Sequence, residues 1–496
     1  MEPDQGEFLP GFFTEPENLL NYDFNLNHFL DNDKYDESFY IDNLTLPGDK
    51  KDLCESFFKS ILFGYNHIYV MKILEKIGYE KNICLPIIHK WDNQNIKINN
   101  FVIISHPDDA ERICKKHIKK APNLKQLLNT SVISTTDNED WKNQRQTMNM
   151  AFLPKQSLGE VFPISQKRAN HCSDLLKEVS ENYTKSVDMS DFFLNETQAQ
   201  LQLAMFGFTD EFQEKTNKNV RNAFLGINPL YLETFAREAY QEILQSNGPL
   251  SEVIKSSSKD EIQFIGNILI FAFAGHDTTG HTLSWLLYEL CKHPKYKQDL
   301  IQEIDEYWLN HNEETYGSFK ELPFMTKCIT ETLRLWPALA NGTYRELEYD
   351  EEIIGLNGEK TFVPKGTYCQ IMNWTRHRNP DLWGDDVNIF NPYREFKDEE
   401  IWDYKGFGTS HVSSERFSPF TYGPRHCVGK NFSQMEMRLI LLNLFKNYDF
   451  VLDSKQKETI NNPKYMGINT FTMGPQNVYD GILGMYVNVI PRKSKL

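Results

Sequence analysis

The longest stretch of regular patterning lies in the middle of the chain. Residues 260–292 are mostly apolar from Phe264 to Ala274 and amphipathic after Leu283, which predicts one long, largely buried helix. Further helices and strands follow from helical spacing and from short β-branched segments. The predicted helices are 65–79, 106–117, 139 onward, 327–335 and 434–447, and the predicted strands are 83–89, 98–105 and 484–489. The pattern therefore predicts a mainly α fold with small β-sheets.

Charge divides the chain into two unequal parts. Residues 1–50 carry twelve acidic side chains against Lys34 and Lys50, which leaves only −6 of the total charge of −16 for the rest of the chain. We expect residues 1–45 to be a poorly ordered acidic extension and residues 46–496 to form a single domain. Neither part is basic enough to predict nucleic-acid binding.

Cysteine usage and hydropathy indicate where the protein works. The eight cysteines are scattered without a Cys-x-x-Cys pair, which argues against a zinc site or disulfide framework and indicates a reducing compartment. No apolar run approaches the ~20 residues needed to cross a bilayer, so no transmembrane anchor is expected. The helical spacing of Phe57–Leu74 favours a core-facing helix, with contact to a membrane surface as the alternative. We expect a cytoplasmic protein that is soluble or peripherally associated with a membrane.

One cysteine is distinguished by its neighbours. Cys427 lies just before a predicted helix, between Gly423 and Gly429, with Arg425 two residues upstream and Phe420 at the start of the segment. The glycines permit a tight turn and a close approach to a flat partner. Arg425 and the N–H groups at the helix start favour negative charge, which predicts a thiolate. A thiolate in an apolar loop suits a single axial ligand to haem iron, whereas a cysteine without these neighbours would most often be a buried free thiol.

The complete Phe-x-x-Gly-x-Arg-x-Cys-x-Gly spacing of residues 420–429 resembles the haem-binding loop of the cytochrome P450 family, with every defining position filled. The resemblance extends over about residues 46–496. It implies the cytochrome P450 fold and haem b (iron protoporphyrin IX) bound through Cys427. It also implies monooxygenation, in which one atom of O2 enters a lipophilic small-molecule substrate and the other becomes water.

A second segment resembles a haem-binding motif of the same family. Trp141 and Arg145 project from one face of a predicted helix, and the pair alone would indicate an ordinary amphipathic turn. Beside Cys427 the pair resembles the family's Trp-x-x-x-Arg, which implies that both side chains hydrogen-bond a haem propionate. The resemblance also implies a propionate ligand at Arg345. His377 is expected either near a propionate or at the surface.

Polar residues occur inside the long predicted helix. Gly275 costs about 1 kcal/mol relative to alanine in a helix interior, and the polar side chains beside it can bond back to the preceding turn and distort the helix. In isolation the segment would indicate a helix-packing glycine beside solvent-facing residues. Residues 274–279 resemble the family's oxygen-activating segment without substitution. The resemblance implies that Thr278 hydrogen-bonds dioxygen, Asp277 relays protons and Ala274 lies against the haem.

A third set of residues is predicted to be structural. Glu331 and Arg334 share a helix face, and Arg394 lies in a segment that resembles the family's Pro-Glu-Arg-Phe, although Tyr393 and Glu395 depart from that pattern. We expect Glu331, Arg334 and Arg394 to form a buried ionic triad that stabilises the haem-side segment. Buried charges persist only when they are paired.

The electrons for this chemistry are expected to come from a separate electron-donor protein of the reductase or ferredoxin type. The sequence contains no Gly-x-Gly-x-x-Gly motif after a strand and no flavin- or ferredoxin-like segment. Lys142, Arg425 and Lys430 are candidates for the basic patch on which that protein docks. The segments 127–132, 338–343 and 470–472 are expected to border the substrate.

Two alternative functions remain open at the level of sequence. One is a haem-thiolate isomerase, dehydratase or peroxygenase that needs no reductase, although such enzymes usually alter the acid–threonine pair that is intact in this chain. The other is a non-catalytic haem-binding sensor or scaffold.

Overall fold

The computed structural model describes residues 44, 56–57, 60, 66–90, 96–122, 128, 130–153, 157–225, 228–403, 412–454, 456, 472, 474–475, 477–479 and 482–492, with side chains described outside 86–100 and 476–483. Nearly all of the acidic extension therefore lies outside the described residues. The same holds for Thr470 and Phe471 of the expected substrate-bordering segment.

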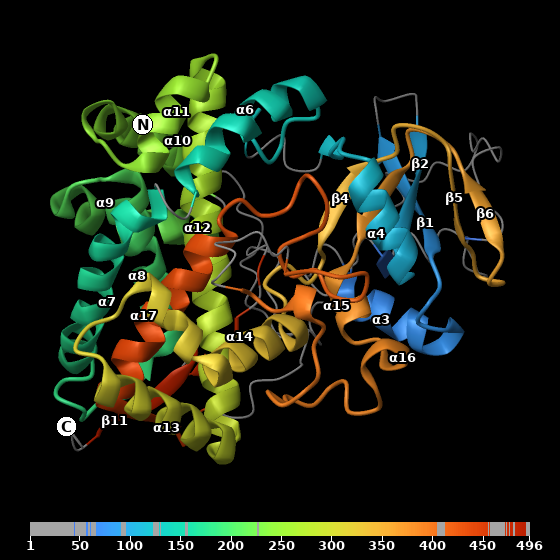
Figure 1. Ribbon diagram of the computed structural model, residues 1–496. Coiled ribbons are helices and arrows are strands. Elements are labelled where there is room, and N and C mark those ends of the chain that lie inside the picture. Colours follow the sequence, from blue (N-terminus) through green and yellow to red (C-terminus); the bar gives the residue numbers. More distant parts are fainter. Residues whose placement is uncertain are drawn as a thin grey trace, which may run out of the picture.

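The chain folds into a helical part and a smaller part that contains most of the β-structure (Figure 1). The helices are α3 (Asn66–Ile77), α4 (Pro107–Lys116), α6 (Asn138–Ala151), α7 (Gly159–Val179), α8 (Met189–Gln200), α9 (Asp210–Leu225), α10 (Pro229–Gln245), α11 (Pro249–Ser257), α12 (Glu261–Lys292), α13 (Pro294–Asn310), α14 (Pro323–Leu335), α15 (Asn373–His377), α16 (Pro380–Trp383) and α17 (Lys430–Asn447). Shorter turns are the π-helical η5 (Leu201–Phe206) and the 3-10 segments η6 (Tyr316–Glu321) and η7 (Asp398–Glu400). The predicted mainly α fold is confirmed.

The strands form small sheets. Their bounds are β1 (Ile83–Lys90), β2 (Ile96–Ile104), β3 (Val187–Asp188), β4 (Thr343–Glu346), β5 (Glu351–Ile354), β6 (Lys360–Val363), β7 (Tyr368–Ile371), β8 (Tyr448–Leu452), β9 (Asn477–Tyr479), β10 (Ile482–Gly484) and β11 (Tyr486–Pro491). The largest sheet has the order β1-β2-β7-β4, in which β2 and β7 are parallel and the other neighbours antiparallel. The predicted hairpin is the antiparallel pair β1–β2, which pairs Ile83 with Ile103.

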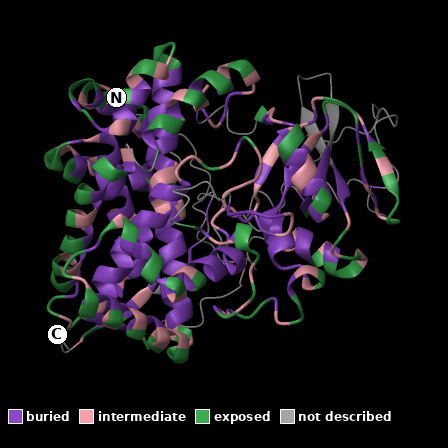
Figure 2. Cartoon of the chain, in the orientation of Figure 1, coloured by how far each residue is buried: buried purple, intermediate pink, exposed green. Residues whose placement is uncertain are grey.

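Helix α12 runs through the centre of the helical part and is buried along most of its length (Figure 2). Asp260 caps its N-terminus by accepting a hydrogen bond from the amide of Gln263 at 2.8 Å. The hydroxyl of Thr278 bonds back to the carbonyl of Ala274 at 2.9 Å, as anticipated, yet α12 remains helical throughout.

Glycines in α12 allow α8 and η5 to pack closely against it. A Cβ at Gly275 would lie 2.7 Å from a methyl carbon of Leu201, and one at Gly280 would lie 3.0 Å from the Cα of Leu194. The packing interpretation of Gly275 is therefore correct, although Gly275 also lines the internal cavity. In the part of the chain that the structure describes, no helix has the length and apolar character needed to cross a membrane.

Candidate active site

The loop that precedes α17 presents the sulfur of Cys427 to an internal cavity. The amide of Cys427 donates to the carbonyl of Phe420 at 2.8 Å, and Gly429 is the N-cap residue of α17. Gly423 has a φ of +70°, and a Cβ there would lie 2.4 Å from the carbonyl oxygen of Cys114. Only glycine fits this close approach without strain. The loop therefore fixes the position of the sulfur through backbone contacts.

The thiol of Cys427 does not carry the lowered pKa that the sequence predicts. Burial raises its pKa above the ordinary value, and this effect outweighs Arg145, Lys430 and the backbone N–H groups of Gly429 and Lys430, which lower the pKa. This direction applies to the thiol without iron, so the thiolate ligand stays a prediction, and the side chain itself is exposed to the cavity. A metal ion bound to the sulfur would deprotonate it outright.

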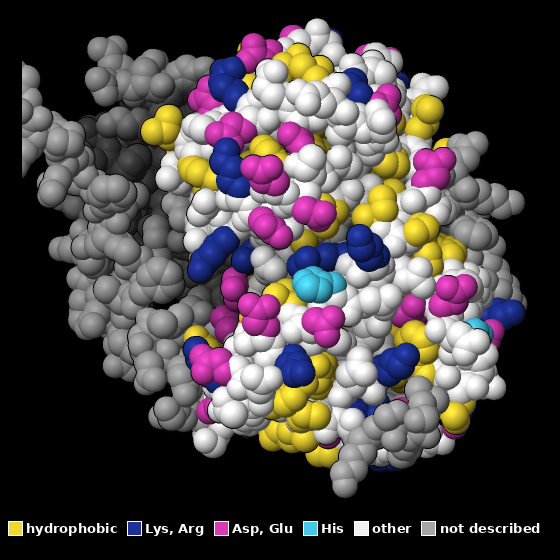
Figure 3. All heavy atoms as spheres, turned by 90° about the vertical axis from the view of Figure 1, so that its left-hand side faces the viewer, with side chains coloured by type: hydrophobic (Ala, Val, Ile, Leu, Met, Phe, Trp, Pro, Cys, Tyr) yellow, Lys and Arg dark blue, Asp and Glu magenta, His cyan; other side chains and the backbone are white. Residues whose placement is uncertain are grey.

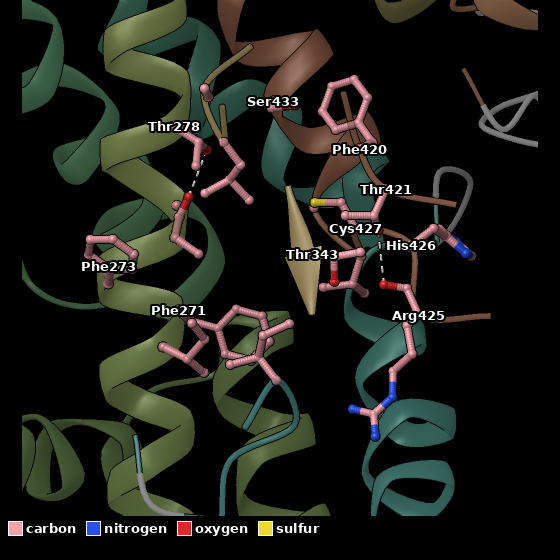
Figure 4. A pocket seen from close by; sticks show the side chains of 18 of the residues that line it. Phe271, Phe273, Thr278, Thr343, Phe420, Thr421, Arg425, His426, Cys427 and Ser433 are labelled. Carbon is pink, nitrogen blue, oxygen red and sulfur yellow. Dashed lines mark hydrogen bonds between the residues drawn. The ribbon is translucent and has the colours of Figure 1, made fainter. Parts of the chain in front are cut away.

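A cavity of about 310 Å³ lies between the Cys427 loop and the middle of α12. Ala274 and Thr278 line it from α12, while Phe420 and Cys427 line it from the loop (Figure 4). The remaining lining is largely apolar. It includes Leu128, Val132, Ile133, Phe152, Leu201, Ile270, Phe271, Phe273, Leu333, Ala338 and Leu339. The cavity thus combines one cysteine sulfur with a largely apolar wall and with hydroxyl groups from α12 and from Ser433 of α17.

Four basic side chains gather at this cavity, three of them predicted from the sequence. Lys120, Arg145 and Arg425 line it, and Arg345 is fully buried in β4 beside the lining residues Thr343 and Tyr344. Burial is the first cause that lowers the pKa of each of the four, and the pKa of Arg425 falls to about 9. The neighbouring positive charges of Arg145 and Arg345 lower it further. Such crowding is unfavourable without a negative partner.

Trp141 and Arg425 complete this cationic end of the cavity. The guanidinium of Arg425 lies 4.3 Å from the centre of the Trp141 ring and donates to backbone carbonyls, including that of Ile118 at 2.9 Å. Its side chain points away from the sulfur of Cys427, so it does not favour the thiolate as expected (Figure 4). Lys120 was missed by the sequence analysis, because a lysine in a polar loop gives no sign that it will be buried. It donates to the hydroxyl of Thr343 at 2.6 Å.

These residues fit a haem. Nη2 of Arg145 and both Nε and Nη2 of Arg345 are buried, and no hydrogen-bond partner for them occurs among the described residues. A buried guanidinium nitrogen without a partner is costly, and carboxylates are its usual complement. Haem carries two propionates, a flat apolar ring and an iron that accepts one thiolate, which correspond to the unpartnered nitrogens, the apolar walls and Cys427.

Asp277 is turned away from the cavity that Thr278 lines. The hydroxyl of Thr278 reaches the cavity surface, whereas Asp277 is buried and accepts a hydrogen bond from the hydroxyl of Thr472. His276, to which the sequence analysis assigned no role, packs between Phe224 and Phe273. Of the two predicted oxygen-activating residues, the structure places Thr278 at the cavity and Asp277 beside it.

The three residues of the predicted ionic triad are in contact. Arg334 donates to both carboxylate oxygens of Glu331 at 2.7 Å, and Nε of Arg394 lies 3.3 Å from the same carboxylate. Arg334 also donates to the carbonyl of Val387 at 2.8 Å. Arg394 also pairs with Asp386 at 2.8 Å, so each guanidinium of this group has a carboxylate partner, and none of the triad residues lines the cavity.

Two sequence-based placements are wrong. His377 is buried and accepts a hydrogen bond from the amide of Ser418 at 3.0 Å, so the surface alternative fails, and His377 does not line the cavity either. Lys430 and Arg425 are also buried, so they cannot form an exposed basic patch with Lys142. Both errors concern residues at the edge of helices, His377 at the end of α15 and Lys430 at the start of α17, which other elements cover.

The helical fold, and the cavity with a cysteine sulfur in its wall, are typical of a haem-thiolate protein. The sequence model of the family described as cytochrome P450 matches residues 96–241 and 239–478. The chain therefore belongs to the cytochrome P450 family, whose members are haem monooxygenases.

Relatives in animals share this family name. Cytochrome P450 3A12 of Canis lupus familiaris is 26% identical over 373 residues, which are 64% of this chain and 70% of that protein. Putative cytochrome P450 CYP13A7 of Caenorhabditis elegans is 32% identical over 247 residues, which are 50% of this chain and 43% of that relative. Cytochrome P450 4F3 of Rattus norvegicus is 35% identical over 188 residues, which are 38% of this chain and 33% of that protein.

Proposed function

We propose that the chain inserts one oxygen atom of O2 into a lipophilic organic molecule, with Cys427 as the thiolate ligand of haem b. The observation that carries this proposal is the placement of the Cys427 sulfur and the Thr278 hydroxyl across one apolar cavity (Figure 4). A thiolate-ligated haem supplies the activation of dioxygen and favours cleavage of its O–O bond.

The protein's own residues position the cofactor. Arg145, Arg345 and Lys120 would hold the propionates as charge-assisted donors, and Trp141 and Arg425 would brace that end of the cavity. The backbone N–H groups of Gly429 and Lys430 stabilise negative charge on the sulfur. Gly423 lets the loop pack against Cys114, and Gly429 lines the cavity in which a haem would bind. Ala274, with its small side chain, leaves room on the α12 side.

The substrate is lipophilic because apolar side chains dominate the cavity wall. Phe152 and Phe271 stack with ring centres 5.8 Å apart, and together with Leu128 they exclude water from the α12 side. The segment 338–343, predicted to border the substrate, contributes Ala338, Leu339 and Thr343 to the lining. Thr278 holds a proton at its hydroxyl where the substrate meets α12, and Asp277 exchanges protons next to it.

A separate protein delivers the electrons, because no dinucleotide-binding motif occurs within this sequence. The docking surface remains to be assigned, since of the three proposed basic residues only Lys142 is exposed. The face at the left of Figure 1 does not present one either. Basic, acidic and hydrophobic side chains are interspersed across it (Figure 3). We place the reaction in a reducing compartment, the cytoplasm, either in solution or at a membrane surface. The described cysteines support this because no disulfide joins any two of them.

The test begins with the purified holoprotein and a panel of lipophilic compounds. Binding in the cavity is expected to shift the haem absorption spectrum, and the compounds that do so are then incubated with isotopically labelled O2 and a reductase or ferredoxin system. One labelled oxygen atom in the product supports the proposal. Turnover with peroxide that persists in Thr278→Ala, combined with no reductase-driven turnover in the wild type, would instead indicate a peroxygenase. A haem protein that binds no apolar compound and consumes no O2 would indicate a sensor.

A further inference from the structure

A buried chain of hydrogen bonds lies next to the cavity and joins α12 to the C-terminal part of the protein. Thr472 donates its hydroxyl hydrogen to Oδ2 of Asp277, and Nδ1 of His281 lies 2.6 Å from the same hydroxyl oxygen. Nδ1 of His281 also lies 3.7 Å from Oδ1 of Asp277. The exposed fractions of the three residues are only 4% for Asp277, 1% for Thr472 and 1% for His281. We call these three residues the Asp277 latch.

With Asp277 as a carboxylate, the hydrogens in the latch run in one direction. The carboxylate of Asp277 can only accept, so the single hydroxyl hydrogen of Thr472 is used toward Asp277. The hydroxyl oxygen must then accept from His281, which places a hydrogen on Nδ1 of the imidazole. Burial lowers the pKa of His281, while Asp277 acts in the opposite direction, and the neutral form with one N–H follows. Nδ1 of His281 therefore donates a hydrogen bond to the hydroxyl oxygen of Thr472, and Nε2 carries no hydrogen.

The imidazole of His281 is confined by the backbone that follows Thr472. A Cβ at Gly474 would lie 2.5 Å from Cδ2 and 2.8 Å from Nε2 of His281, so only glycine lets the segment pack this closely. Nε2 itself is buried and has no hydrogen-bond partner in the described part of the chain. Burying a ring nitrogen without a hydrogen-bond partner costs free energy. This cost indicates that the hydrogen bond made by the other nitrogen, Nδ1, is the reason for the placement of the imidazole.

We propose that Thr472 and His281 are positioning residues that hold the carboxylate of Asp277 away from the cavity and thereby control when this acid takes part in proton delivery. Neither residue belongs to the Ala274–Thr279 segment, and Thr472 comes 195 residues after Asp277 in the sequence. The inference rests on the proposed function, because it assigns a control element to the acid that the function uses. It predicts that breaking the latch changes the electrostatics of the cavity and the use of electrons, without changing haem ligation.

Four variants separate this role from a merely structural one. Thr472→Val keeps the shape of the side chain but removes its hydroxyl, and His281→Phe keeps a flat ring but removes the donor. His281→Asn places an amide N–H where Nδ1 lies and should rescue the latch. The matched control is Ser284→Ala, which removes a buried hydroxyl of α12 that bonds to the carbonyl of Gly280 at 2.8 Å and does not line the cavity.

Two measurements are made on each holoprotein after its ferrous–carbonyl spectrum has shown thiolate ligation. The first is the infrared stretching frequency of carbon monoxide bound in the cavity, which responds to the nearby charge of Asp277 and requires no turnover. The second is the product formed per electron consumed, with the remainder recovered as peroxide. We expect Thr472→Val and His281→Phe to shift the stretching frequency. We expect both to lower the yield by about tenfold, since misplacing a catalytic group by an ångström can cost up to about 100-fold.

The outcomes distinguish the latch from the function on which it rests. A shifted frequency and reduced yield in Thr472→Val and His281→Phe, with wild-type values in His281→Asn and Ser284→Ala, support the latch. Wild-type values in Thr472→Val, or equal losses in His281→Asn and His281→Phe, overturn it. Should His281→Phe fail to fold, Thr472→Val alone decides. Loss of the thiolate signature in the wild type would refute the proposed function itself, which is a separate result.

Discussion

Two buried arginine clusters of this protein differ in one respect, which is whether their charges are matched. In the triad, the carboxylate of Glu331 pairs with Arg334 and Arg394. The guanidinium of Arg334 donates hydrogen bonds to both oxygens of this carboxylate. At the cavity, Arg145 and Arg345 have buried nitrogens without a partner, and no ion pair to a carboxylate occurs there among the described residues.

This difference in charge pairing indicates that one cluster is structural and that the other binds an anionic ligand. A matched buried ion pair contributes little over an apolar replacement, but losing one partner is strongly destabilising. An unmatched group of cations is unfavourable in the folded protein and is compensated only when an anionic group binds. We infer that the triad is structural, whereas the cavity cluster would destabilise the haem-free protein and bind the propionates.

The largest effect is expected for Glu331→Gln. Removing this carboxylate leaves the buried guanidinium of Arg334 without a charged partner, while Arg394 keeps Asp386 at 2.8 Å, and it should lower the free energy of unfolding by roughly 3–5 kcal/mol. The change in unfolding free energy is measured by denaturant unfolding of the holoprotein. The matched control is Glu352→Gln, because Glu352 lies 3.9 Å from Lys360 in an exposed pair and should contribute at most about 1 kcal/mol. Equal losses in the two variants would contradict the distinction between the clusters.

Arg345→Gln should show opposite signs in the haem-free and the haem-bound protein. Without haem, relief of an unmatched buried charge should raise the free energy of unfolding by roughly 1–3 kcal/mol. With haem, loss of a propionate donor should weaken cofactor retention by a similar amount. Unfolding of the haem-free form and the rate of haem transfer to an acceptor protein measure the two effects. A variant that destabilises both forms would show that Arg345 is a structural residue like Arg334.

The smallest expected effect concerns a buried histidine. Unlike a buried arginine, a buried histidine can avoid the cost of an unpaired charge by releasing its proton. Burial lowers the pKa of His276 to about 4, with Arg221 and His281 lowering it further and Asp277 and the carbonyl of Ala272 raising it. The unfolded chain takes up this proton near pH 6.5, so the stability contributed by His276 is complete above pH 6.5 and is lost as the pH falls toward 4.

The expected loss is about 1.4 kcal/mol at pH 5.5, one pH unit below the unfolded value. His276→Gln should flatten the decline in unfolding free energy between pH 6.5 and 5. His293→Gln serves as the control of opposite sign, because Glu289 raises the pKa of His293 and its contribution is present below pH 6.5 and lost above it. An unchanged acid slope in His276→Gln would show that other groups govern the acid sensitivity.

Patterns local in sequence proved predictable, whereas properties set by packing did not. The bounds of α12 and the β1–β2 pairing follow from apolar periodicity and β-branched segments, and the Cys427 loop follows from its glycine spacing. The burial of Lys120 and Lys430 and the raised pKa of Cys427 depend on how separate elements enclose these groups. Asp277 is hydrogen-bonded to Thr472, a residue far away in the sequence, so no local pattern could reveal this contact.

The central claim is that the sulfur of Cys427 is the ligand of the haem iron. Its most direct test is the ferrous–carbonyl absorption spectrum of the purified wild type, of Cys427→Ala, and of Cys291→Ala as a control at a partly buried cysteine that does not line the cavity. We predict a band typical of thiolate ligation in the wild type and in Cys291→Ala, and its complete loss in Cys427→Ala. The same band in Cys427→Ala, with its haem retained, would contradict the claim.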